Sequence, residues 1–241
     1  MKNIIFDIGN SSYKIAIFEK KKLVFHTRIE ALDADLLGDI LSRYLPQKAI
    51  ISSTRPIPEF ITEMLSSHDV DVTYLTKETK KPFKIDYNTL ESLGSDRIAA
   101  VAGGRVLFPK KDLLIIDSGT AITFDYLIDD IFIGGNISLG IHTRFKALNS
   151  FTARLPLVSI PEKVNSPGKS TTEAIEAGVI FGVLYEINEY IRTFLKDNPD
   201  GEVLLTGGDS EYLKERLEYQ VSLCPDVVMV GLNNILEYNA K

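Results

Sequence analysis

A short sequence pattern occurs twice in this chain, once in each half. One copy, DIGNSSYKIAIFE, begins at Asp7, and the other, DSGTAITFDYLID, begins at Asp117; each has a glycine two positions later, Gly9 and Gly119. Both copies follow an apolar stretch, NIIF or LLII, that is typical of a buried strand, and both run into a second strand. A single Asp-x-Gly is a common turn. Two copies in matching strand–turn–strand settings predict that the chain contains two related halves.

Each half continues with a third strand and then with alternating helices and strands. The elements expected in the first half are strands at 23–29, 48–53 and 70–75 and helices at 33–44 and 56–66. Those expected in the second half are strands at 131–137, 201–206 and 226–230 and helices at 140–151, 171–196, 210–217 and at the C-terminus through residue 236. This plan predicts an α/β fold with two domains, 1–109 and 110–241, each a mixed five-stranded sheet with flanking helices, and a central cleft between them.

Composition narrows the choice of partners. Hydrophobic residues make up 44% of the 241 residues, which is enough for a full core. The net charge of −6, without a basic tail, argues against nucleic acid as a partner. No apolar run could span a bilayer and the N-terminus leads directly into a strand, so we expect no membrane partner and a cytoplasmic location. One cysteine and three scattered histidines do not form a zinc-binding motif.

The duplicated hairpin points to a charged ligand. If a pseudo-twofold axis relates the halves, Asp7 and Asp117 approach the same occupant from opposite sides, and two such carboxylates repel each other unless a cation lies between them. The backbone N–H groups of Gly9-Asn10 and Gly119-Thr120, with the hydroxyls of Thr120 and Ser11, could cradle phosphates. A nucleoside triphosphate with Mg²⁺ is the occupant that this pattern favours.

The common nucleotide-binding motifs do not account for this ligand. The stretch PGKST at 167–171 lacks the first glycine of a P-loop, because Lys163 stands in its place. No G-x-G-x-x-G follows the first strand, which argues against a dinucleotide site. The pair Gly207-Gly208 ends a strand and opens a helix, so it could approach an adenine or ribose or form a plain turn; the sequence leaves both readings open.

A candidate for the chemistry lies at the junction of the halves, where a GSDR turn opens a helix. Asp96 falls in the first helical turn, where the helix dipole favours its ionised form, although an acid at this position is also ordinary helix capping. Arg97 beside it could bind an anionic substrate group. Phosphoryl transfer through a loose transition state needs little proton abstraction until late, so such a weak base can suffice.

Six elements, in order along nearly the whole chain, then match one family: the chain resembles the type III pantothenate kinases of the actin-like and sugar-kinase superfamily, whose domains are ribonuclease H-like. The matching elements are DIGNSSYK at 7–14, GSDR at 94–97, DSGTAIT at 117–123, GGNISLGI at 134–141, GKSTTEAI at 168–175 and TGGD at 206–209. The resemblance implies ATP-dependent phosphorylation of the primary hydroxyl of pantothenate, which gives 4'-phosphopantothenate, the first step of coenzyme A biosynthesis.

The resemblance also implies a role for each matching residue. It assigns ATP binding to Asp7, Ile8, Gly9, Asn10, Ser11, Ser12, Tyr13, Lys14 and Thr120, with Mg²⁺ near Asp7. It assigns the pantothenate pocket to Tyr87, Gly94, Ser95, Asp96, Arg97 and Thr171. Within these sets Asp96 is implied to accept the proton of the pantothenate hydroxyl, and Asp117 to help bind a monovalent cation, K⁺ or NH₄⁺.

The resemblance further implies a homodimer in which the partner subunit supplies the segment that holds Thr171. The sequence departs from the family pattern in two places. Leu139 stands where the family often has proline, and Ser170 stands where it often has asparagine. The second departure leaves open whether Thr171 or Thr172 contacts the substrate.

Two other functions fit the same architecture. One is a kinase for another small alcohol, such as a sugar; many of these are longer and carry a Cys/His zinc motif that one cysteine cannot supply. The other is a non-catalytic regulator, which the loss of Asp96 or Asp117 would favour, whereas both are present. A test for ATP turnover separates the regulator from the two kinases.

Overall fold

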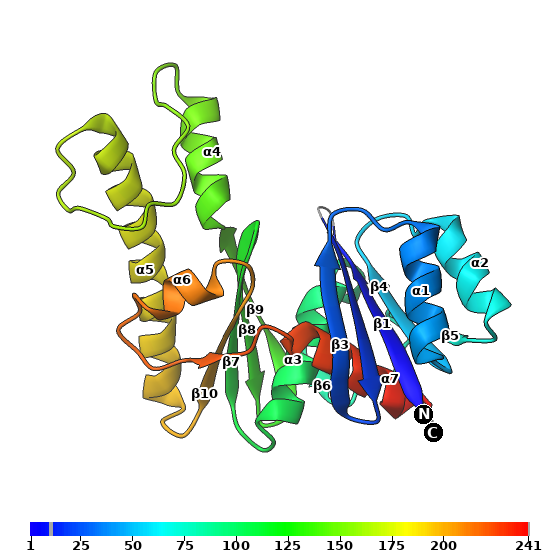
Figure 1. Cartoon of the computed structure of the whole chain (residues 1–241). Coiled ribbons are helices and arrows are strands. Elements are labelled where there is room, and N and C mark those ends of the chain that lie inside the picture. Colours follow the sequence, from blue (N-terminus) through cyan, green and yellow to red (C-terminus); the bar gives the residue numbers. More distant parts are fainter. Residues whose placement is uncertain (10–11, 241) are drawn as a thin grey trace. The chain divides into compact units, whose positions relative to one another are not determined.

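The computed structural model describes residues 1–9 and 12–240, which form two compact units (Figure 1). Unit 1 comprises Met1–Pro109, Asp130–Phe132 and the C-terminal segment from Asp226, and unit 2 comprises Lys110–Asp129 and Ile133–Pro225. Among the described residues, no helix is long and apolar enough to cross a bilayer.

Unit 1 is built on a five-stranded mixed sheet with the order β3-β2-β1-β4-β5. Its strands are β1 (Lys2–Ile8), β2 (Tyr13–Glu19), β3 (Lys22–Ile29), β4 (Lys48–Ser53) and β5 (Asp71–Tyr74). The first three strands are antiparallel neighbours, whereas β4 runs parallel to β1 and β5 runs parallel to β4. The mixed sheet expected for the first half is therefore confirmed.

Two helices, α1 (Ala34–Tyr44) and α2 (Glu59–Ser67), lie side by side on one face of this sheet (Figure 1). Helix α1 begins where the side chain of Asp33 accepts a hydrogen bond from the backbone N–H of Leu36 at 2.9 Å, which satisfies one of the unpaired N–H groups at a helix start. Ile4 and Phe6 of β1 point to this face and pack against the apolar side of α1.

The opposite face of the sheet is covered by α3 (Ser95–Leu107) and α7 (Val227–Asn239), which cross at close range. A Cβ at Gly103 would lie 1.9 Å from the carbonyl oxygen of Val227, and a Cβ at Gly231 would lie 1.8 Å from that of Ala99. Only glycine fits at either position. Helix α7 is also tied to the sheet, because Asn3 of β1 donates a hydrogen bond of 2.8 Å to Asn233.

This packing corrects two expectations. The sequence predicted a strand at 226–230 and placed the C-terminal segment in the second half. The β-branched Val227 and Val228 favour a strand locally, but the glycine crossing holds the whole segment as helix α7 in unit 1. Tertiary packing has overridden local propensity.

The strands of unit 2 belong to a six-stranded sheet with the order β11-β10-β7-β8-β9-β6. The strands are β7 (Leu113–Ser118), β8 (Ala121–Ile128), β9 (Ile131–Leu139), β10 (Glu202–Thr206) and β11 (Ser222–Leu223). Five strands were expected; the sixth is the two-residue β6 (Lys84–Ile85) of unit 1, which pairs in parallel with the first residues of β9. The short 3₁₀ helix η1 (Leu90–Ser92) follows β6 in the chain.

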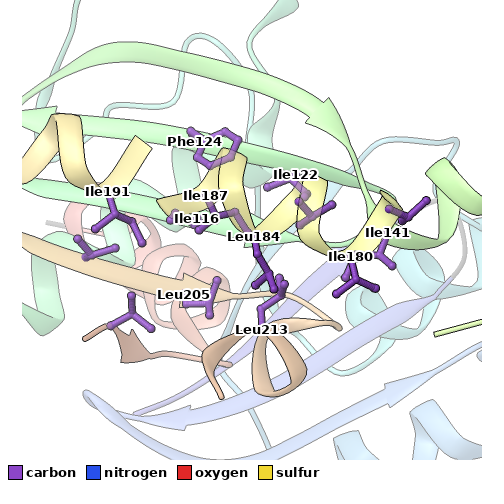
Figure 2. Packing of buried hydrophobic residues seen from close by; sticks show 14 of the residues in the cluster. Ile116, Ile122, Phe124, Ile141, Ile180, Leu184, Ile187, Ile191, Leu205 and Leu213 are labelled. Carbon is purple, nitrogen blue, oxygen red and sulfur yellow. The ribbon is translucent and has the colours of Figure 1, made fainter. Parts of the chain in front are cut away.

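The core of unit 2 lies between its strands and the helix α5 (Thr171–Asp197), with α4 (Ile141–Phe151) and the short α6 (Ser210–Lys214) completing it. Figure 2 shows Ile116 and Phe124 of the hairpin facing Leu184, Ile187 and Ile191 of α5. The apolar positions of α5 recur every three or four residues, which gives the 27-residue helix one continuous buried stripe. The long helix expected at 171–196 is therefore confirmed.

Candidate active site

The first aspartate of the repeat lies near the end of β1, on the face of the sheet that α3 and α7 cover. Asp7 is 8% exposed, and its Oδ2 lies 3.1 Å from the Nζ of Lys14, its cross-strand partner on β2. At the turn that follows, the N–H of Gly9 donates to the carbonyl of Ser12 at 3.0 Å. The hydroxyl of Ser12 in turn accepts a hydrogen bond from Nε of Arg28 at 3.3 Å. The hairpin therefore carries one buried carboxylate beside two cationic side chains.

The strand next to β1 links this hairpin to the start of α3. In the parallel register, Asp7 is the neighbour of Ser52 on β4, so their side chains point to the same face. The hydroxyl of Ser52 donates a hydrogen bond of 2.9 Å to the hydroxyl of Ser95, the first residue of α3. The sheet and this hydrogen bond thus bring the first hairpin and the GSDR turn to the same end of unit 1.

Asp96 is exposed at the start of α3, in the first helical turn that the sequence predicted for it. Its Oδ1 accepts a hydrogen bond of 2.8 Å from the backbone N–H of Arg97, and so takes the place of a capping side chain that Gly94 at the N-cap cannot supply. A Cβ at Gly94 would lie 2.4 Å from the same Oδ1. Glycine at position 94 therefore leaves room for the carboxylate, whose other lone pairs can accept a proton or a hydrogen bond.

Arg97 is almost fully buried, with 6% of its surface exposed. Its guanidinium carbon lies 5.9 Å from the ring centre of Tyr87 and 5.8 Å from that of Phe132, and the two rings are stacked with centres 6.3 Å apart. Contact with aromatic faces stabilises a guanidinium that has lost most of its water. Unit 1 therefore joins Tyr87 to the GSDR turn, as expected for two parts of one pocket.

The second hairpin, β7–β8, has a tighter environment. The N–H of Gly119 donates to the carbonyl of Ala121 at 2.9 Å, and the carbonyl of Thr120 accepts from the N–H of Gly140 at 3.0 Å. A Cβ at Gly140 would lie 1.9 Å from the carbonyl oxygen of Gly119. Gly207 has a φ of +94°, and a Cβ there would lie 2.5 Å from Oδ1 of Asp117. Backbone therefore closes around this aspartate and its turn.

A second carboxylate lies close to this hairpin. The backbone N–H of Asp209 donates to the carbonyl of Ser118 at 3.2 Å, and its Oδ1 lies 3.7 Å from Nε2 of His142 near the start of α4. Burial raises the pKa of the Asp209 carboxyl above its ordinary value of 3.8, while His142 and Ser118 act in the opposite direction. The TGGD element therefore forms part of the surroundings of the second hairpin.

Comparison with known proteins shows which family this chain belongs to. The sequence profile of the family described as "Type III pantothenate kinase" matches residues 3–193. A type III pantothenate kinase of Phocaeicola vulgatus is 41% identical over 99% of both chains, and one of Porphyromonas gingivalis strain W83 is 39% identical over 98% of both. The chain belongs to the type III pantothenate kinase family. The resemblance in the six sequence elements is thereby confirmed.

The fold of this type III pantothenate kinase family member also resembles that of sugar kinases. The crystal structure of a ROK hexokinase from Thermus thermophilus covers all of both chains with a TM-score of 0.51 at 11% identity. At that identity the likeness concerns the fold alone. It confirms the expected superfamily architecture.

Thr171 lies in unit 2 as the first residue of α5. Ser170 is the N-cap of this helix: its hydroxyl accepts from the N–H of Glu173 at 3.2 Å, and the carboxylate of Glu173 accepts from the N–H of Lys169 at 2.6 Å. This resembles a capping box, except that Glu173 accepts from the residue before the N-cap rather than from the N-cap itself. Serine and asparagine cap helices about equally well, so a serine at position 170 preserves the N-cap of α5. Thr171 and Thr172 are both exposed there.

The other departure, Leu139, is half exposed at the end of β9. Its carbonyl accepts a hydrogen bond of 2.8 Å from Arg144, and the close contact at this turn is made by the next residue, Gly140. A leucine side chain at position 139 therefore does not enter the turn.

Unit 1 brings together most of the residues that the family resemblance assigns to ATP and pantothenate. Ile8 and Tyr13 are paired in register at the base of the first turn. Asn10 and Ser11, also predicted to bind phosphate, lie outside the described residues. Unit 2 contains Asp117 and Thr120 in the second hairpin and Thr171 on α5.

The sequence reasoning missed several polar residues at the two hairpins. Ser52 and Arg28 were not considered, and Asp209 was treated only as part of a motif. The signal for Ser52 was available in principle, since β4 runs parallel to β1 and the ends of parallel neighbours meet at one edge of the sheet. No pattern in the sequence indicates that Arg28 bonds to Ser12.

The donor atoms at both hairpins fit hard cations. Asp7 offers carboxylate oxygen near hydroxyl groups, and Mg²⁺ in kinases is held by one or two carboxylates together with phosphate and water oxygens. Among the described residues, no group of three or more His, Cys, Asp or Glu side chains could enclose a metal ion. At the second hairpin, the carboxylate of Asp117 and neighbouring backbone carbonyls present oxygen only.

Proposed function

We propose that this chain transfers the γ-phosphoryl group of ATP to the primary hydroxyl of pantothenate, giving 4'-phosphopantothenate and ADP, the first step of coenzyme A biosynthesis. The observation that carries the proposal is family membership over nearly the full chain, with the family's GSDR turn set beside the Asp7 hairpin in unit 1. Kinase membership brings ATP as the phosphoryl donor.

Asp96 is the proposed proton acceptor. In the transfer, the bond between the γ-phosphorus and the β,γ-bridging oxygen breaks, and a bond forms between that phosphorus and the pantothenate oxygen. The hydroxyl proton passes to the Asp96 carboxylate, and the electron pair of the broken bond stays on ADP. Asp96 is exposed and held by the N–H of Arg97, which supports a carboxylate ready to accept a proton late in a loose transition state.

The first hairpin, residues 7–14, is the proposed phosphate site. Lys14 and Arg28 place positive charge beside the turn, and among the described residues a Cβ at Gly9 would come no closer than 3.6 Å to its nearest neighbour, the carbonyl oxygen of Ser12. Exposed N–H groups and cations at one turn bind phosphate oxygens. Mg²⁺ near Asp7 would neutralise phosphate charge, and Thr120 of the second hairpin would also contact ATP.

The proposed pantothenate pocket consists of Tyr87, Gly94, Ser95, Asp96, Arg97 and Thr171. The buried guanidinium of Arg97 suits an anionic or carbonyl group of the substrate, because a charged donor in a poorly hydrated site forms strong hydrogen bonds. Tyr87 supplies an aromatic wall beside it.

Asp117 is the proposed ligand of a monovalent cation, K⁺ or NH₄⁺, which activates the enzyme. The oxygen-rich turn around it supports this role. A bound cation would supply positive charge near the nucleotide phosphates. Asp117 and the adjacent carbonyls would hold that cation in a fixed position.

We also propose that the active form is a homodimer in which the partner subunit contributes the segment with Thr171. Several large apolar side chains are exposed on β9, α4 and α5 of unit 2, and such a set suits an interface between copies. They are Ile137, Leu139, Phe151 and Tyr185. Sedimentation of the purified protein tests this, and a monomer with full activity would contradict it.

Product analysis tests the proposed reaction directly. The protein is incubated with ATP, Mg²⁺ and K⁺ and one acceptor at a time: pantothenate, glucose or N-acetylmannosamine. We expect ³¹P NMR and mass spectrometry to show one phosphate monoester, formed from pantothenate. Phosphorylation of a sugar instead would favour the sugar-kinase alternative, and no ATP turnover with any acceptor would favour the regulator.

A further inference from the structure

Phe132, which no sequence motif singles out, lies against two residues of the proposed pantothenate pocket. Its ring centre is 5.8 Å from the guanidinium carbon of Arg97 and 6.3 Å from the ring centre of Tyr87. Arg97 in turn lies 5.9 Å from the ring centre of Tyr87, so the three groups form a nearly equilateral triangle. Phe132 is completely buried. It can therefore support the other two side chains but cannot touch a ligand.

The backbone that carries Phe132 is fastened to the backbone that carries Tyr87. Strand β6 pairs in parallel with the first two residues of β9. The N–H of Lys84 donates to the carbonyl of Asp130 at 3.3 Å, and the N–H of Asp86 donates to the carbonyl of Phe132 at 2.9 Å. The second of these bonds lies one residue before Tyr87. The pairing therefore holds the two rings in a stack, with 4° between their planes.

Helix α3, which carries Arg97, holds the same segment at a second point. Arg105, further along the helix, donates through Nη2 to Oδ2 of Asp130 at 3.0 Å and through Nε to Oδ1 of the same carboxylate. Two parallel hydrogen bonds of this kind fix the carboxylate in orientation as well as in position. The segment 130–132 is thus bound to α3 at both of its ends, at Asp130 by an ion pair and at Phe132 by the contact with Arg97.

This arrangement restricts the side chain of Arg97. An arginine side chain has many rotamers, and fixing one of them costs conformational entropy. The attraction between a poorly hydrated guanidinium and an aromatic face favours the one position in which Arg97 lies beside both rings. Because Phe132 is buried and fastened on two sides, this attraction acts before any substrate arrives. A ligand that binds Arg97 then loses less free energy in ordering it.

We propose that Phe132 is a positioning residue for pantothenate binding, whose ring holds the guanidinium of Arg97 where it meets the substrate. Phe132 acts through Arg97 and the neighbouring ring of Tyr87 and makes no contact with pantothenate itself. This inference rests on the proposed function for the identity of the ligand. The predicted order of the Arg97 side chain can be measured without any ligand.

The first test weakens the attraction of the ring for a cation while nearly keeping its shape. Phe132 is replaced by phenylalanine analogues with one, two and three ring fluorines, which withdraw electron density from the ring face. Calorimetry measures the Kd for pantothenate with Mg²⁺ and the β,γ-imido analogue of ATP present. We expect this Kd to rise with each fluorine, by about 3-fold or more at the third, because fewer chains hold Arg97 in place. The Kd of the ATP analogue should change by less than about 2-fold. A constant Kd for pantothenate would overturn the proposal.

The second test needs no substrate. The ¹⁵N relaxation of the Nε–H group of Arg97 reports how tightly its guanidinium is held on the fast timescale. Phe132→Leu keeps a large apolar side chain but removes the aromatic face. We expect the order parameter of this N–H bond to fall clearly below that of the wild type. An unchanged order parameter would contradict the holding role of Phe132. If Phe132→Leu does not fold, the same measurement on the protein with three fluorines at position 132 decides.

Phe18 is the matched control. It is also buried in unit 1, and among the described residues no arginine or lysine lies over its ring. The same fluorinated analogues at position 18 should leave the Kd for pantothenate unchanged. A rise as large as that at position 132 would mean that affinity follows the general packing of unit 1, and would overturn the proposal. If the wild type does not bind pantothenate, the proposed function fails, yet the relaxation measurement still tests Phe132.

Discussion

The two copies of the Asp-x-Gly hairpin share their strands and their turn glycine but differ in what surrounds the aspartate. In the first hairpin Asp7 pairs across the strands with Lys14, and in the second Asp117 pairs with Thr123, because the second turn is one residue shorter. The residue opposite the aspartate is therefore a lysine in the first hairpin and a threonine in the second.

The charged groups that lie beside the two turns also differ. Lys14 and Arg28 lie beside the first turn. Around the second turn are Asp209, His142 and closely packed backbone. The two copies thus differ in their electrostatic environments, in the direction of the phosphate proposed at the first hairpin and the cation proposed at the second.

Among the substitutions at the two hairpins, the largest effect is expected when the first hairpin loses the ammonium group of Lys14. Lys14→Thr gives Asp7 the kind of partner that Asp117 has and removes a donor to phosphate. We expect kcat/KM for ATP to fall by roughly 10²- to 10³-fold. Steady-state kinetics measure this, with Lys22→Thr, an exposed lysine at the start of β3, as the control. A change of less than about 2-fold would show that the first hairpin does not bind phosphate.

A smaller effect is expected at the second hairpin. Asp117→Asn removes the negative charge proposed to bind K⁺, so the K⁺ concentration for half-maximal activation should rise on the order of 10-fold, whereas the KM for pantothenate changes little. Activity is titrated with K⁺ at constant ionic strength. If the wild type is equally active with Na⁺ and with K⁺, Asp117 has no such role.

The complementary exchange is Thr123→Lys, which places an ammonium group opposite Asp117 as Lys14 is placed opposite Asp7. Its activity should no longer depend on added K⁺, since the lysine supplies the charge. A variant that stays fully K⁺-dependent would argue against a cation at this position.

The difference in packing predicts a difference in stability. Gly140→Ala would force a Cβ to within 1.9 Å of the Gly119 carbonyl oxygen, so we expect the free energy of unfolding to fall by about 1–3 kcal/mol. Gly9→Ala meets nothing closer than 3.6 Å and should change it by less than about 1 kcal/mol. Urea unfolding measures both. Equal effects would contradict the close contact between Gly140 and the second turn.

The smallest effect is expected for Asp209→Asn, on the pH dependence of stability. Burial raises the pKa of the Asp209 carboxyl in the folded state above its ordinary value of 3.8. Below pH 3.8 the carboxyl is protonated in the folded and the unfolded chain, and its burial costs little. As the pH rises through the raised pKa, the buried carboxyl ionises and the folded state loses stability. Asp209→Asn is neutral at every pH. Its unfolding temperature should therefore rise relative to that of the wild type as pH increases above 3.8. A difference that is constant with pH, measured by scanning calorimetry, would contradict the raised pKa.

Much of the fold could be predicted because its elements follow simple patterns. The strand at 48–53 is a short apolar run, and the helix from Thr171 has regular apolar spacing and an N-cap at Ser170. The helix that begins at Val227 could not be predicted, because the valines of 226–230 favour a strand. The close contact of Gly231 with α3 holds this segment as a helix. A close crossing between segments far apart in the chain leaves no local signal.

Some residues of the candidate site could likewise be predicted from the sequence, and others could not. Asp7 and Asp117 were found because the repeat places them in equivalent turns, and Asp96 because it opens a helix at the junction. Ser52 was not found, because only the parallel pairing of β4 with β1 brings it beside Asp7. An ungapped alignment of the two repeats does not reveal that the second turn is one residue shorter. For this reason it does not show that Thr123 takes the place of Lys14 opposite the aspartate.

The most direct measurement is ADP release by the purified protein with ATP, Mg²⁺ and pantothenate, with and without K⁺, for the wild type and Asp96→Asn. We expect pantothenate-dependent turnover that K⁺ stimulates and that Asp96→Asn lowers by about 10²- to 10⁴-fold with the fold intact. Turnover of the variant close to that of the wild type would remove Asp96 from the mechanism. Folded wild-type protein without pantothenate-dependent turnover would contradict the proposed function itself.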